Sequence, residues 1–77
     1  MTDLTHHLQG SQQHAEAVRV FHEDALDELA NETIRTLRCI RQFRRAGLFA
    51  EAVAARRHIT SLRRQARRHR AALEVAR

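Results

Sequence analysis

The chain has 77 residues, and its formal net charge at pH 7 is +5 because 14 basic residues outweigh 9 acidic ones. This length corresponds to one domain at most, and so short a chain buries little apolar surface unless a disulfide, a metal or a partner chain adds to the core. The only cysteine is Cys39, which excludes a disulfide within the chain and a zinc site of the Cys-x-x-Cys type. Oligomerisation is therefore the expected source of additional core.

Membrane and catalytic classes are also disfavoured. No apolar stretch approaches the roughly 20 residues that span a bilayer. The N-terminal sequence MTDLTHHLQG lacks the basic start and apolar block of a signal peptide. The chain has no glycine-rich phosphate loop and no nucleophile motif. We expect a cytoplasmic protein that is not an enzyme and needs no cofactor.

Residues 1–10 show no hydrophobic period, and we expect them to form a flexible N-terminal arm. Ser11 follows Gly10 and is a suitable N-cap for a helix. No proline or glycine interrupts residues 12–45, and apolar side chains recur there at helical spacing. This predicts a helix over 11–45. Its apolar stripe is wide, which is typical of a helix that contacts more than one neighbour.

Gly47 is the only plausible break after Ser11, and glycine suits the left-handed position that ends a helix. We therefore predict a turn over 46–48 and a second helix over 48–76, giving a hairpin over 11–77. Small and apolar residues of the second helix alternate at steps of three and four, as in a coiled-coil seam. The seam positions are Ala52, Ala55, Ile59, Leu62, Ala66, His69, Leu73 and Ala76.

The stretch GLFAEA, from Gly47 to Ala52, resembles the turn inside a tetratricopeptide repeat. In that repeat a glycine, an aromatic residue two positions later and a Glu-Ala pair join two antiparallel helices. The resemblance covers about ten residues, and the chain has no 34-residue repeat. It implies an antiparallel turn at this place.

The predicted fold is therefore all-α: an antiparallel two-helix hairpin. The wide stripe of the first helix also favours a homodimer that forms a four-helix bundle. The residues expected to pack in the core or in the dimer interface are Phe21, Leu26, Leu29, Ile34, Leu37, Ile40, Phe43, Ile59, Leu62 and Leu73.

Charge is divided unevenly along the chain. Residues 1–34 contain one arginine and seven acidic residues, whereas residues 35–77 contain 13 arginines and two acidic residues. If the chain folds back at Gly47, residues whose numbers add up to about 94 lie at the same height on the two helices. Asp27 then lies level with Arg67, and Asp24 lies level with Arg70. We expect such pairs to favour the antiparallel hairpin, although an exposed ion pair contributes only about 0–1 kcal/mol.

The arginines near the turn have no such partners apart from Glu51. We define the turn-end cluster as Arg38, Arg41, Arg44, Arg45, Phe49, Arg56 and Arg57. Its simplest interpretation is a solvated surface. The function we favour is a small protein-binding regulator, an adaptor or inhibitor, that docks this cluster and its helix faces onto a larger, more acidic protein. The alternative is a nucleic-acid-binding regulator that places the same arginines on phosphates.

The histidines and Cys39 are weaker candidates. His22 and His69 lie on apolar faces at similar heights in the hairpin, so they can form a pH-sensitive contact or a small site if they approach each other. We favour histidines of the seam with local hydrogen bonds, and we expect no metal. Cys39 lies at the edge of the apolar stripe, where a buried or interface cysteine is the favoured interpretation.

Overall fold

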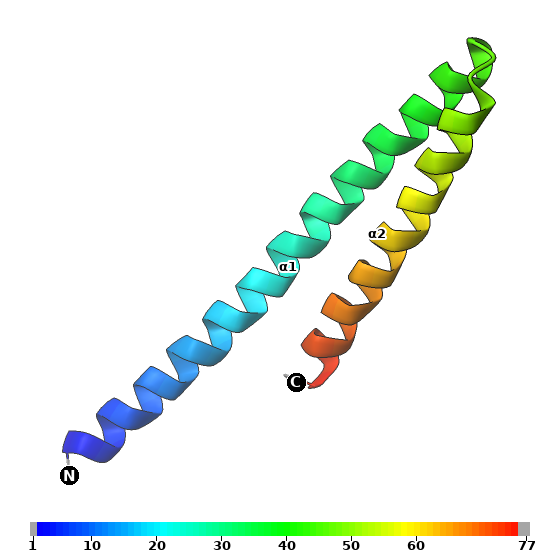
Figure 1. Cartoon of the computed structure of the whole chain (residues 1–77). Coiled ribbons are helices and arrows are strands. Elements are labelled where there is room, and N and C mark those ends of the chain that lie inside the picture. Colours follow the sequence, from blue (N-terminus) through cyan, green and yellow to red (C-terminus); the bar gives the residue numbers. More distant parts are fainter. Residues whose placement is uncertain (1, 76–77) are drawn as a thin grey trace.

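The computed structural model describes the backbone of residues 2–75 and the side chains of residues 10–75. Helix α1 spans Thr2–Arg45, and helix α2 spans Phe49–Val75. The two helices run antiparallel and pack along one another (Figure 1). The molecule is 69 Å long but only 16 and 13 Å across. Residues 2–75 contain no strand, so the predicted all-α hairpin is confirmed.

The turn over residues 46–48 is the predicted one, and its hydrogen bonds explain why α1 ends there. The Leu48 N–H donates to the Phe43 carbonyl at 2.8 Å, and the Gly47 N–H donates to the Arg44 carbonyl at 3.1 Å. These two bonds form a Schellman motif, which satisfies carbonyls at the helix end. Gly47 has φ 75°, a left-handed conformation that favours glycine.

The structure differs from the prediction at the start of α1, which begins at Thr2 rather than Ser11. Residues 2–10 are helical, and Ser11 lies inside the helix instead of capping it. The physical reason is that Gly10 lowers helix propensity by only about 1 kcal/mol relative to alanine, and no proline is present to stop the helix. At the other end α2 closes at Val75, and the expected last helical residue, Ala76, lies outside the described residues.

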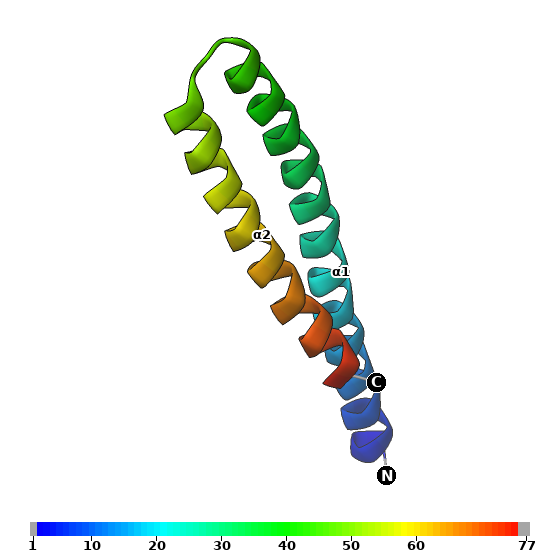
Figure 2. The ribbon, with the colours of Figure 1, turned by 90° about the vertical axis from the view of Figure 1, so that its right-hand side faces the viewer.

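The N-terminal part of α1 extends past the end of α2 (Figure 2). The cause is the difference in length, because α1 has 44 residues and α2 has 27. Side chains of residues 10–17 are all exposed, and Val18 is the first that is partly buried. The packed hairpin therefore begins near Val18.

The core is a thin seam between the two helices. Its buried apolar side chains are Ile40, Ala52, Ile59 and Leu62. Four further residues of the predicted packing set are half-buried: Leu26, Leu29, Phe43 and Leu73. Three are exposed: Phe21 at 64%, Ile34 at 49% and Leu37 at 47%. Within one hairpin the predicted set thus divides into a true seam and an outward-facing apolar group.

Among the described residues, one polar side chain is buried in this seam. Thr36 is only 7% exposed, and its hydroxyl donates to the Glu32 backbone carbonyl at 2.8 Å. Thr33 bonds in the same way to the Leu29 carbonyl, one turn earlier. Because both hydroxyls find acceptors within their own helix, threonine is tolerated beside the seam without an unsatisfied polar group.

Candidate functional site

The turn-end cluster is exposed in every member. Its four α1 arginines belong to the last two turns of the helix, and Phe49, Arg56 and Arg57 belong to the start of α2. Phe49 is 67% exposed. Within residues 10–75, none of the six guanidinium groups lies within 4.0 Å of a carboxylate. The turn end therefore combines six arginines that make no ion pair among the described residues with one exposed aromatic ring.

Two of these arginines also have a local role. Arg44 and Arg45 occupy the last turn of α1, where a positive charge interacts favourably with the helix dipole. Glu51 lies in the first turn of α2, where a negative charge interacts favourably with the helix dipole. The other four arginines lie away from a helix C-terminus.

The ion pairs predicted between the helices are wrong. Asp24 and Asp27 are exposed, and among the described side chains neither of them pairs with an arginine of α2. Asp27 precedes Leu29, a seam residue, by two positions, which is about 200° around the helix. Its carboxylate therefore points away from α2. The charge asymmetry along the chain is real, but the closest ion pairs of α1 are within the helix itself.

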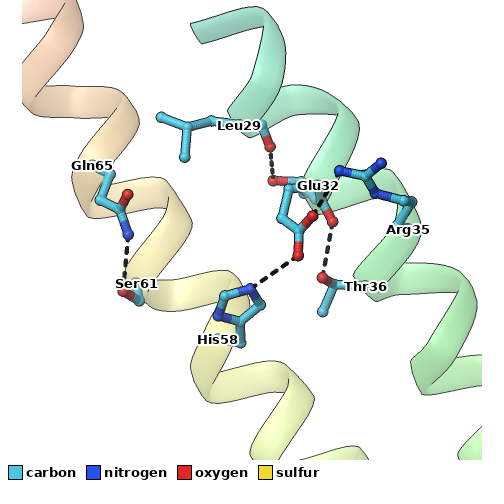
Figure 3. A network of polar contacts seen from close by, with 8 residues as sticks. Leu29, Glu32, Arg35, Thr36, His58, Ser61 and Gln65 are labelled. Atoms are coloured by element: carbon cyan, nitrogen blue, oxygen red, sulfur yellow. Dashed lines mark hydrogen bonds and ion pairs between the residues drawn. The ribbon is translucent and has the colours of Figure 1, made fainter. Parts of the chain in front are cut away.

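Glu32 makes the one charged contact between the helices in the described part of the chain (Figure 3). One carboxylate oxygen accepts a hydrogen bond from Arg35 at 2.8 Å, and the other lies 3.4 Å from Nε2 of His58. The Arg35 hydrogen bond, and then the His58 hydrogen bond, hold the pKa of Glu32 below its ordinary range. In the predicted register, His58 lies one helical turn away from the position that is level with Glu32. The register therefore predicts that these two residues lie near each other.

We expect Arg35→Gln to raise the pKa of Glu32 more than His58→Gln does, because the arginine is the larger cause. Since the folded-state pKa is lowered, the carboxylate stabilises the fold above the ordinary glutamate pKa, and this stabilisation is lost as the pH falls through the folded-state value. A ¹³C NMR titration of the Glu32 carboxyl measures all three values. A larger shift in His58→Gln would contradict this assignment.

His22 and His69 meet across the helices near the open end of the hairpin. Their Nδ1 atoms are 2.8 Å apart, and their ring centroids are 5.1 Å apart. Phe21 places its ring edge-on to both, with centroids at 5.2 and 6.1 Å. One imidazole must donate and the other accept, so the bond exists only while the accepting ring is neutral. The similar heights predicted for these two histidines are confirmed, and the contact that the sequence left open is present.

An apolar groove of about 580 Å³ follows one side of the hairpin. Its lining is mainly aliphatic from α1, while α2 supplies a row of arginines. The lining residues are Leu26, Leu29, Ala30, Thr33 and Ile34 from α1, and Leu62, Arg63, Ala66, Arg67 and Arg70 from α2. The turn-end cluster predicted from the sequence does not include Arg63, Arg67 and Arg70. Their spacing of four and three residues places them on one face of α2, and this spacing was the sequence signal that could have identified them. The opposite groove is more polar and contains Glu28, Asn31, Glu32, Arg35, Gln65 and His69.

The structure also bears on the expectations for Cys39, for a metal site and for a membrane-spanning helix. Cys39 is a free, exposed thiol, so a buried cysteine is the wrong interpretation within one hairpin. Among the described residues, no three histidine, cysteine or acidic side chains gather closely enough to hold a metal ion. Neither helix, over its described residues, has the length and apolar character needed to cross a membrane.

Comparison with known proteins adds no further constraint on function. The chain matches no protein family, and it shows no significant similarity to a curated protein or to a solved structure.

Proposed function

We propose that this protein is a small, non-catalytic protein-binding regulator, an adaptor or inhibitor, that docks its turn-end cluster onto a larger, more acidic protein. The observation that carries the proposal is the exposed Phe49 at the same end of the hairpin as six arginines, none of which has a carboxylate partner among the described side chains. Regulation would follow from steric occlusion or bridging of the target.

The chemistry of the cluster favours a protein target. Aromatic residues and arginine are the side chains most enriched at binding hot spots. A guanidinium group can bind a carboxylate through two parallel hydrogen bonds, which sets orientation as well as affinity. Arginines and one aromatic ring at the same end of the hairpin complement an acidic surface that offers an apolar pocket for Phe49.

The homodimeric four-helix bundle is part of the same proposal. Among the described residues, four apolar side chains are buried within one hairpin, and the exposed Ile34 borders an apolar groove. A core this small stabilises a chain of this length weakly. A second hairpin over the groove would supply the missing apolar contacts.

Nucleic-acid binding is the alternative, because Arg38, Arg41 and Arg45 recur at helical spacing near the end of α1 and can follow a phosphate backbone. Phe49 is the only aromatic side chain of the cluster, whereas binding of single strands usually uses several bases stacked on aromatic rings. Phosphate binding weakens steeply with salt across many sequences, and this property separates it from binding of one specific protein.

The test is capture from a cell lysate by the full chain, with and without nuclease. We expect one stoichiometric protein band that survives nuclease and is lost in Arg56→Glu with Arg57→Glu. The matched control is Arg64→Glu with Arg68→Glu, which makes the same charge change on exposed α2 positions away from the turn. Captured nucleic acid that disappears with nuclease would support the alternative. If both double variants capture the protein band as well as the wild-type chain does, the cluster is only a solvated surface.

A further inference from the structure

The exposed side of α1 carries charged residues at positions that are symmetric about Ile34, with acids on the N-terminal side and arginines on the C-terminal side. Asp27 and Arg41 lie seven residues on either side of Ile34, and Glu23 and Arg45 lie eleven residues on either side. Steps of seven and eleven return to nearly the same helix face. All five side chains are exposed. Acid, aliphatic and arginine therefore follow one another along a single line.

This line borders the apolar groove. Ile34, Ala30 and Leu26 line the groove from α1. Ile34 is 49% exposed, and the adjacent Leu37 is 47% exposed. Asp27 makes no ion pair among the described residues, and neither does Arg41. The centre of the line thus offers apolar surface, and its two ends offer charges of opposite sign.

We propose that a second copy of the chain covers this groove with its α1 antiparallel to the first, so that Ile34 meets Ile34 at the two-fold axis. Each Asp27 then lies opposite Arg41 of the other copy, and each Glu23 lies opposite Arg45. This arrangement rests on the homodimer of the proposed function and specifies its geometry. The turns lie at opposite ends of the bundle.

The charges along α1 separate this arrangement from the alternatives. A parallel pairing of the two α1 helices sets Asp27 against Asp27 and Arg41 against Arg41, which is unfavourable on both sides of the axis. A dimer with both turns at one end brings together two clusters of six arginines, with Glu51 as the only acid of each turn end. The antiparallel dimer keeps the clusters apart and places each beside acidic residues.

The arrangement also divides the turn-end cluster between two tasks. Arg41 and Arg45 face the second copy of the chain. Arg44, Arg56 and Arg57, together with Phe49, remain available for the target protein. Dimerisation and target binding therefore use different arginines, and variants can test them separately.

The first test measures the dimer dissociation constant of the full chain by sedimentation velocity at low salt. Asp27→Arg and Arg41→Asp are each expected to weaken the dimer about tenfold, because each turns two symmetric attractions into repulsions. The double variant Asp27→Arg with Arg41→Asp restores the opposite charges and the wild-type net charge. We expect its dissociation constant to return to within about twofold of wild type.

Glu28→Arg is the matched control, since it makes the same charge change on the side of the polar groove. It is expected to leave dimerisation unchanged. A double variant that dimerises no better than the single variants would overturn the proposed pairing. Equal weakening by Glu28→Arg and Asp27→Arg would overturn it as well.

A distance measurement tests the geometry independently. In the Cys39→Ser background, Ala46→Cys carries the only thiol, at the exposed turn. Ala46 is 12 residues from Ile34, so two spin labels are about 36 Å apart along the bundle axis at 1.5 Å per residue. Turns at one end would bring the labels to about 20 Å or less and overturn the arrangement while leaving the homodimer intact. Absence of any dipolar coupling in a folded monomer would overturn both.

Discussion

Leu62→Ala is expected to lower the free energy of unfolding by about 2–4 kcal/mol. Leu62 is 4% exposed and is one of the four buried apolar side chains among the described residues. Its truncation leaves a cavity in a seam that has few other contacts to compensate. A chain of this size has only a few kcal/mol of total stability, so the variant should be largely unfolded at 25 °C. Urea unfolding followed by circular dichroism at 222 nm, at matched protein concentration, measures the change.

Leu48→Ala is the matched control for this prediction. Leu48 is 44% exposed, and its backbone N–H keeps the bond to the Phe43 carbonyl after substitution. The same chemical truncation should therefore cost less than about 1 kcal/mol. Equal destabilisation by the two variants would show that the described seam is not the main source of stability.

Gly47→Ala is expected to destabilise the hairpin by about 1–2 kcal/mol, because a side chain at φ 75° meets its own backbone. No neighbouring atom lies within 4 Å of the added methyl group, so the whole cost comes from backbone conformation. Gly47→Val should cost more, since a β-branched side chain tolerates positive φ even less well. Thermal unfolding of the two variants measures both effects.

Gly10→Ala makes the same substitution at a helical position, where alanine is expected to stabilise the backbone conformation and not to strain it. Gly10 lies within α1, and an added methyl group there also meets nothing within 4 Å. Alanine is the better helix former by about 1 kcal/mol, so this variant should keep or increase the helical signal. Destabilisation by Gly10→Ala would indicate that residues 2–10 do not form the helix described.

The hairpin itself was predictable because its signals are local. Gly47 is the only glycine after residue 10, no proline is present, and the seam from Ala52 to Leu73 is regular. The start of α1 was not predictable, since the Gly10-Ser11 pair has the composition of a boundary and yet lies within the helix. Composition indicates where a helix is able to end, and one glycine seldom forces it to do so.

The site was predicted less completely, because side-chain direction decides it. Asp27 was placed level with Arg67, but it points away from α2 and makes no ion pair there. The similar heights of His22 and His69 were predictable, and the two rings meet because both lie on the seam side. The arginines lining the groove became apparent only when the helices were placed side by side.

In the proposed assembly one hairpin is half of a homodimer, with the apolar groove facing its own copy and the turn end facing a target. Sedimentation equilibrium of the wild-type chain shows whether the second copy is bound. We expect a mass of twice the chain mass at micromolar concentration, shifting to monomer in Ile34→Asp. A wild-type chain that is folded and monomeric throughout this range would rule out the assembly.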